Sequence, residues 1–265
     1  MYIDPRWILI LVFSALAYGT LSPVIVARGL LFLSGAMMHS VLLAISVGIA
    51  LSETIGLAPY VWAIPIAILP TYLIALLRRR GLREDMATAI MLSITVSLSV
   101  ISVYLVLTKF RVSADLWSYV LGDPLLSTWE DVKYVSFLSS IVCVLTLSFY
   151  REFMYLAVDP EYSEVMGMRV WKYDVLLLTL LGVAVVALAR SVGIVLEHVM
   201  VMLPGVIAFQ ISRGIWNALV ISLVVSLVSS IGGLTLSFLS NLAPSGLTGL
   251  IAALIFTVTL IGRRR

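Results

Sequence analysis

The sequence predicts an all-α, polytopic membrane protein, and its composition is the first reason. Of 265 residues, 62% are hydrophobic and 12% are charged, and the mean hydropathy is +1.13. Soluble domains carry about 25% charged residues, roughly twice this share. Apolar runs of about 20 residues, enough to cross about 30 Å of hydrocarbon, recur along the whole chain. We therefore expect a single transmembrane domain over residues 1–265.

Hydropathy windows divide the chain into about nine transmembrane helices. The expected spans cover about residues 8–27, 29–52, 58–77, 86–108, 132–150, 173–190, 193–212, 215–238 and 246–262. Residues before the first span lack a basic cluster, and no small-residue cleavage site follows it, so we do not expect a cleaved signal peptide. Only very short connections separate the first two spans, and likewise the sixth and seventh.

Basic residues are distributed unevenly between the two sides of the expected bundle. One side collects Arg28, Arg78, Arg79, Arg80, Arg83, Arg151, Arg169, Lys172, Arg213, Arg263, Arg264 and Arg265. The other side has Arg6, Lys109, Arg111, Lys133 and Arg190. Because short loops rich in Lys and Arg stay in the cytoplasm, we expect the first side and the C-terminus inside, and the N-terminus outside.

Two connections are too long to be simple turns. The external one, about residues 108–134, contains tryptophans and is expected to lie partly in the membrane interface. In the cytoplasmic one, about residues 151–172, Asp159 is expected to cap a short helix and Pro160 to occupy its first turn. Glu161 then lies near the positive end of the helix dipole, and Gly167 ends the helix.

Both histidines of the chain fall within apolar runs. Ionisable groups at membrane depth are costly and commonly mark a transport path, so we predict that His39, Glu197 and His198 line one. Two alternatives are open. His39 can simply hydrogen-bond a neighbouring helix. At 1.5 Å per residue, Glu197 would be only about 6 Å from the start of its span, where a solvated interfacial carboxylate is plausible.

Several kinds of active site are absent from the sequence. It has no G-x-x-x-x-G-K-[ST] nucleotide loop, no H-E-x-x-H metal motif and no nucleophile elbow. We therefore expect no resident cofactor and no catalysis, and any nucleotide that energises transport must act on a partner. A polytopic membrane enzyme that uses Glu197, His198 and His39 as acid–base groups is an alternative with too few catalytic residues near one face.

Three segments resemble the permease subunits of ABC importers for zinc, manganese or iron. The cytoplasmic "VDPEYSEVMGMRVWKYD" is similar to the family's F-D-P-E-x-A-x-x-x-G-x-x-V-x-x-x-D. The intramembrane "VGIVLEHVMVMLPGVIA" resembles V-G-x-x-L-V-x-A-L-L-V-L-P-A-x-x-A, and the external "DLWSYVLGDPL" resembles D-L-x-x-Y-L-F-G-D-x-L. Together with the number of spans, these segments cover most of the chain.

The resemblance implies a multi-pass cell-membrane permease of an ATP-driven importer, with a divalent transition metal as cargo. It also implies a homodimer, separate ATPase subunits on the cytoplasmic face, an external solute-binding protein and no nucleic acid. A segment coupled to the ATPase would then contain Asp159, Pro160, Glu161, Glu164 and Gly167. Two alternatives are open: these residues only cap a loop helix, or the permease carries a metal chelate or another small solute.

One departure from the family pattern concerns the metal ligands. The family's second span carries G-D-A-x-S-H, whereas this chain has Gly35 where the pattern has aspartate and retains His39. Residues four apart lie on one face of a helix, so the pattern presents a carboxylate and an imidazole together. We predict that Glu197 supplies the missing carboxylate from another helix. His39, Glu197 and His198 then form one site or two successive ones.

Overall fold

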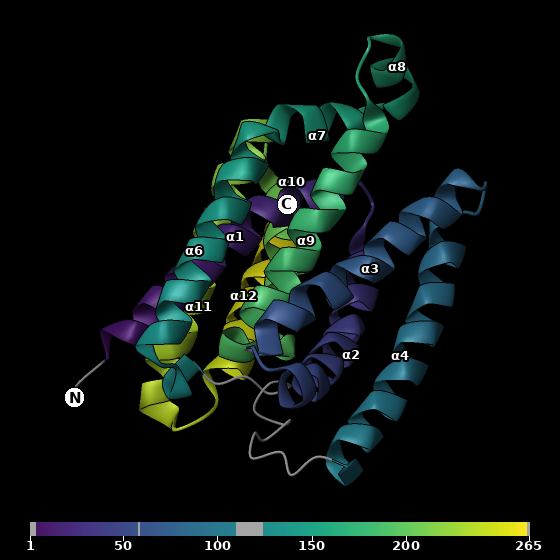
Figure 1. Ribbon diagram of the computed structural model, residues 1–265. Coiled ribbons are helices and arrows are strands. Elements are labelled where there is room, and N and C mark those ends of the chain that lie inside the picture. Colours follow the sequence, from purple (N-terminus) through teal and green to yellow (C-terminus); the bar gives the residue numbers. More distant parts are fainter. Residues whose placement is uncertain (1–3, 58, 110–123, 264–265) are drawn as a thin grey trace.

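The computed structural model describes residues 4–57, 59–109 and 124–263, and these residues form a bundle of helices with no strand (Figure 1). Most of the external connection between the fourth and fifth expected spans, including residues 115–123 of the segment that resembles the family, lies outside these ranges. The all-α prediction is confirmed for the part of the chain that is described.

The long helices follow the expected spans closely. They are α1 (Pro5–Ala27), α2 (Leu31–Ile55), α3 (Pro59–Arg79), α4 (Glu84–Lys109), α6 (Trp129–Ser148), α9 (Val170–Val192), α10 (Ile194–Ile211), α11 (Ile215–Ser240) and α12 (Pro244–Arg263). Among the described residues, seven of these are long and apolar enough to cross a membrane, and α9 and α10 are not among the seven. The predicted number of about nine spans therefore stays a prediction.

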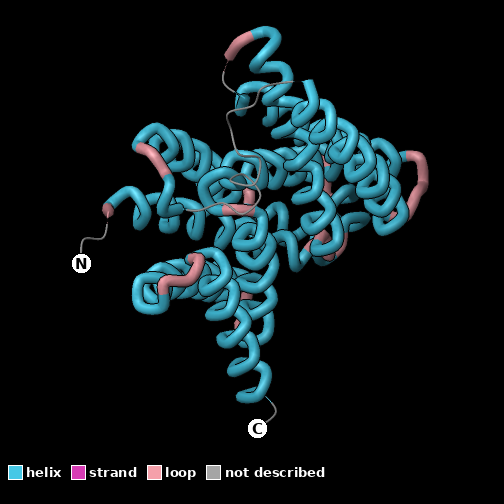
Figure 2. The backbone as a smooth tube through the Cα atoms, turned by 90° about the horizontal axis from the view of Figure 1, so that it is seen from below, coloured by secondary structure: helices cyan, strands magenta, loops and turns pink. Residues whose placement is uncertain are grey.

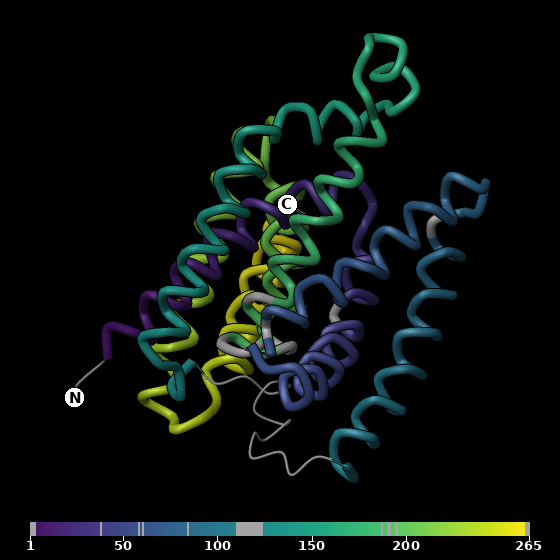
Figure 3. The backbone as a smooth tube through the Cα atoms, in the orientation of Figure 1, coloured from purple at the N-terminus to yellow at the C-terminus, as the bar shows by residue number. Residues whose placement is uncertain are grey.

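The helices form two neighbouring groups joined by α9. Helices α2, α3 and α4 pack on one another, while α1 packs on α6, α10 and α11, and α12 packs on α10 and α11. Figure 3 shows α9 running between the teal α6 and the blue α3. The short helices η1 (Pro124–Leu126), α7 (Tyr150–Val158) and α8 (Pro160–Val165) complete the described fold. Seen from below, the two termini lie at separate edges of the bundle (Figure 2).

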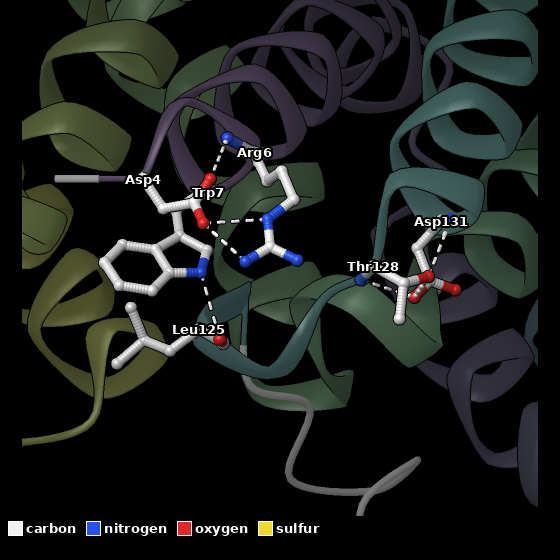
Figure 4. A network of polar contacts seen from close by, with 6 residues as sticks. All are labelled: Asp4, Arg6, Trp7, Leu125, Thr128 and Asp131. Carbon is white, nitrogen blue, oxygen red and sulfur yellow. Dashed lines mark hydrogen bonds and ion pairs between the residues drawn. The ribbon is translucent and has the colours of Figure 1, made fainter.

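A network of polar contacts joins the beginnings of α1 and α6 (Figure 4). Asp4 caps α1, and the indole N–H of Trp7 donates to the backbone oxygen of Leu125 in η1 at 2.9 Å. Thr128 and Asp131 form a capping box at the start of α6. These contacts satisfy backbone groups that the helix ends would otherwise leave unpaired. The bond from Trp7 holds the beginning of α1 against η1, which directly precedes α6, at the end of the bundle opposite α7 and α8 (Figure 1).

Helices α1 and α10 approach each other closely at Ser22 and Gly205. The backbone N–H of Gly205 donates to Oγ of Ser22 at 2.7 Å, and a Cβ atom at Gly205 would lie 2.5 Å from the backbone oxygen of Ser22. On the same helix α1, the backbone oxygen of Gly19 accepts a bond of 2.7 Å from Ser222 of α11. Small residues and interhelical hydrogen bonds of this kind drive helix association where lipid supplies no hydrophobic force.

The turn between α9 and α10 is buried, which the sequence did not predict. Val192 and Leu196, on either side of it, are 0% and 1% exposed, and Gly193 makes the turn with a φ of 82°. A side chain is strained at such a φ, so glycine suits this position. The first turn of α10 is therefore packed inside the protein and does not meet solvent.

We predict that Gly205→Ala lowers the melting temperature of the purified protein by several degrees. In an open helix, alanine gains up to about 1 kcal/mol over glycine. Here the added Cβ would meet backbone at 2.5 Å, and forcing atoms into a packed contact costs about 1–3 kcal/mol or more. Gly246→Ala in α12 is the control, since nothing lies within 4 Å of its Cβ position. Equal melting temperatures for the two variants would contradict the close contact.

Candidate metal site

The two histidines predicted from the sequence lie next to each other. His39 is on α2 and His198 is on α10, and their ring centroids are 6.4 Å apart with the planes at 78°. Metal–nitrogen bonds to imidazole are about 2.0–2.1 Å long, so small side-chain rotations would bring both rings onto one ion. Helices from two distant parts of the chain thus place their imidazoles together.

Gly35 completes the surface around the imidazole pair. A Cβ atom at Gly35 would lie 3.8 Å from Nε2 of His198 and 3.3 Å from Cε of Met202. Gly35 is four residues before His39 and therefore shares its face of α2. An aspartate at this position, as in the family pattern, would begin beside the ring of His198. The glycine leaves the two imidazoles without that carboxylate.

The pair is accessible from one side. His39 is exposed and His198 is half-buried, whereas Ser34, Met37 and Ser40 on α2 are at most 2% exposed. The open side of the pair is therefore the side on which His39 lies.

Glu197 has a different environment from the two histidines. It is 0% exposed, and neither carboxylate oxygen has a hydrogen-bond partner among the described residues. The solvated environment that the sequence allowed for Glu197 is therefore wrong, because its whole side chain is buried.

The structure does not gather Glu197, His39 and His198 around one point. Within the described ranges, no group of three His, Cys, Asp or Glu side chains is arranged to hold a metal ion. Glu197 and His198 are consecutive on a helix with 3.6 residues per turn, so their side chains leave the helix in different directions. The pair of imidazoles is what the fold brings together, and Glu197 lies beside it in the interior.

The predicted cytoplasmic helix is present as α8. The backbone N–H of Tyr162 donates to Oδ1 of Asp159 at 2.9 Å, and Pro160 occupies the first position of the helix. Glu161 lies in the first turn, and Gly167 follows the helix with a φ of 87°. The four local expectations for this helix are confirmed, because cap, proline, acidic residue and glycine are all short-range signals.

Exposed apolar side chains surround the acidic residues of this segment, and sequence reasoning missed them. Val158, Val165, Met166 and Tyr162 are 86%, 84%, 66% and 62% exposed, although α7 and α8 are not membrane spans. Large exposed apolar groups outside the membrane commonly mark protein contact sites. The available signal was the alternation of apolar and acidic residues in "VDPEYSEVMG".

Glu164 lies on a different side of α8 from this apolar surface. With Arg78 and Arg79 of α3 and Trp171 of α9 it lines a cavity of about 310 Å³. The Arg79 guanidinium stacks over the Trp171 ring at 4.1 Å from its centroid. Helix α8 is thus separated from α3 by a hollow, and only Ser163 of its residues is buried.

Comparison with known proteins assigns the chain to a family. The model of the ABC 3 transport family matches residues 3–263, which is nearly the whole sequence. The chain belongs to the ABC 3 transport family. As a member of this family, it is a multi-pass transport subunit rather than an enzyme, in agreement with the sequence motifs and the apolar helices.

Individual relatives of this ABC 3 family member are distant but extend over most of its length. The manganese transport system membrane protein MntC of Listeria monocytogenes is 26% identical over 244 residues, which are 92% of this chain and 84% of that one. The manganese import system permease protein ScaB of Streptococcus parasanguinis is 26% identical over 242 residues, 91% of this chain and 84% of that one.

A solved structure supports the fold of this ABC 3 family member. PsaBC from Streptococcus pneumoniae, in complex with Fab, superposes with a TM-score of 0.81 at 23% sequence identity. The match covers 96% of this chain and 89% of the other. The arrangement of helices is thus shared even where most residues differ.

We predict that Glu197→Leu raises the melting temperature of the purified protein. A buried polar group with no partner costs about 1–3 kcal/mol, and leucine removes that cost at similar size. Glu197→Gln, which keeps a polar group in place, should stabilise less. A clear loss of stability in Glu197→Leu would show instead that the carboxylate has a partner or a bound ion in the assembled protein.

Proposed function

We propose that the chain is the permease subunit of an ATP-driven importer for a divalent transition metal ion: zinc, manganese or iron. The observation that carries the proposal is the pair His39 and His198, whose rings lie 6.4 Å apart between two membrane helices. Imidazole is a ligand for several transition metals, and a transport site must bind weakly enough to release its cargo. Two relatives are named as manganese transport or import proteins, which favours a metal ion as the cargo over a chelate or another solute.

The chemistry of the site bears on which metal is carried. Imidazole suits zinc, copper, iron and nickel, whereas manganese prefers carboxylate and other oxygen ligands. With Gly35 in place of an aspartate, the site proposed here is richer in nitrogen than the family pattern. Glu197 could add an oxygen ligand only after it turns toward the pair, and its inclusion in the transport path stays a prediction.

We place the end of the bundle with α7 and α8 in the cytoplasm and propose that the ATPase subunit docks there. The whole of residues 1–265 is then one permease domain with a coupling segment at about residues 151–172. This segment is shaped by Asp159, Pro160, Glu161, Glu164 and Gly167. The exposed apolar side chains beside them offer a hydrophobic surface that a partner protein could bury. An external solute-binding protein would deliver the metal at the opposite end.

A second copy of the chain is the proposed cover for the open side of the imidazole pair. His39 is exposed although it lies in a membrane helix, and an imidazole facing lipid is unfavourable. A homodimer that places α2 near its interface would shield His39 from lipid and enclose the path. A delivered ion would then move between protein surfaces.

We expect His39→Ala and His198→Ala each to reduce metal uptake by about tenfold or more in vesicles reconstituted with the ATPase, because each removes a ligand. The double variant should be little worse than either single one, since ligands of one ion act together. Gly35→Asp should raise manganese uptake relative to zinc and partly rescue Glu197→Gln if the two carboxylates share a role. Unchanged uptake and metal preference in both single variants would exclude this site.

A second expectation concerns the coupling segment at about residues 151–172. Val165→Asp places a charge on the most exposed apolar residue of α8 and should weaken association with the ATPase subunit, as should Glu164→Arg. The control is Leu126→Asp, since Leu126 in η1 is 75% exposed at the opposite end of the bundle. Co-purification of the ATPase measures the effect. If both α8 variants retain as much ATPase as the control, docking occurs elsewhere.

A further inference from the structure

Arg28 differs from most basic residues at its end of the bundle. It caps α1, and its side chain is 7% exposed. By contrast Arg83, Arg151, Arg169 and Arg213, at the same end, are exposed, as expected of residues that only fix membrane orientation. A buried guanidinium needs partners, because its charge is costly to remove from water.

The partners of Arg28 come from two other helices. One nitrogen of the guanidinium donates to the backbone oxygen of Leu156 in α7, and another forms an ion pair with Asp174 in α9. The side chain of Asp174 is itself only 16% exposed. We call these three residues, Arg28, Leu156 and Asp174, the Arg28 junction. The planar guanidinium holds both partners at once, which a single ammonium group would do poorly.

The junction ties α7 firmly to the membrane helices. Phe153 and Leu156 of α7 are each 1% exposed, and the hydroxyl of Tyr150 donates to the backbone oxygen of Ile215 in α11 at 2.8 Å. Because α8 follows α7 directly through Asp159, a force on α8 is carried into α7 and from there to α1.

Helix α1 connects the junction with both histidines. Less than two turns before Arg28, Ser22 of α1 meets Gly205 of α10, the helix that carries His198. Beyond Arg28, only Gly29 and Leu30 separate α1 from α2, which carries His39. A displacement of the C-terminal end of α1 would therefore act on both helices of the imidazole pair.

We propose that Arg28 is a positioning residue. By joining α7 and α9 to the end of α1, it links the coupling segment at about residues 151–172 to the pair His39 and His198. The inference rests on the proposed function, since it assumes that an ATPase acts on α8. Arg28 itself contacts no metal. Its role is to keep α1 in a fixed relation to α7, so that movement of the segment changes the spacing of His39 and His198.

The test compares Arg28→Lys with Asp174→Asn in the assembled complex with its ATPase, reconstituted in vesicles. Lysine keeps the charge but not the two-pronged contact, and asparagine keeps the shape but not the ion pair. We expect both variants to fold, to retain the ATPase and to hydrolyse ATP. Metal ions carried per ATP hydrolysed, with manganese and zinc as the probes, should fall by about fivefold or more.

The chain offers a matched control at the same end of the bundle. Arg83 and Asp85 form an ion pair of 2.9 Å whose side chains are 78% and 56% exposed. Arg83→Lys and Asp85→Asn should leave the ratio of transport to hydrolysis unchanged, because an exposed pair contributes little. The double variant Arg28→Asp with Asp174→Arg should recover part of the ion pair but not the contact with Leu156, and so regain only part of the ratio.

The outcomes separate the two proposals. If wild-type complex carries metal with ATP and the junction variants match it, the role of Arg28 is excluded while the proposed function stands. If the wild-type complex hydrolyses ATP but transports no metal, the proposed function itself fails. Should Arg28→Lys lower the melting temperature and the ATPase content together, Asp174→Asn decides, and a wild-type ratio in that variant overturns the proposal.

Discussion

The contact between α1 and α10 at Ser22 and Gly205 is the constraint on which the rest of the structure depends. Backbone meets backbone there, with a hydrogen bond of 2.7 Å and no room for a Cβ atom. This contact fixes how far α10 is shifted along α1, and with it the position of His198 beside His39. In lipid, such close packing of small residues replaces the hydrophobic force that holds a soluble core together.

The polar features of the chain lie in two regions, which helix α1 connects. In one region the imidazole pair sits between α2 and α10, and the buried carboxylate of Glu197, next to His198 in sequence, has no hydrogen-bond partner among the described residues. At the end with α7 and α8, charged and exposed apolar side chains surround a short capped helix. Helix α1 spans the distance between the regions, with Ser22 against α10 and Arg28 against α7 and α9.

The sequence was sufficient for every feature that depends on short-range signals. Hydropathy predicted the helices, and the cap at Asp159 and the stop at Gly167 predicted α8. The pairing of His39 with His198 was predicted only as one of two arrangements, because it depends on how distant helices pack. The burial of Glu197 was missed since a buried turn at Gly193 looks, in a hydropathy profile, like any other break between spans.

The partners of Arg28 also lay beyond sequence reasoning. An arginine at the end of an apolar run usually anchors the helix in the membrane, and nothing local distinguishes this one from Arg83. Its buried contacts with Leu156 and Asp174 arise only when α7 and α9 fold against α1. Residues that join elements far apart in sequence are thus the ones for which a structure was needed.

The central claim is that one metal ion in transit binds both His39 and His198. The most direct measurement is the number of nitrogen couplings in the pulsed electron paramagnetic resonance spectrum of Mn²⁺ held by the complete complex. The account predicts two coupled imidazole nitrogens in the wild type, one in each single alanine variant and none in the double variant, since each histidine supplies one nitrogen ligand. A wild-type spectrum without imidazole nitrogen, or one that neither substitution changes, would contradict it.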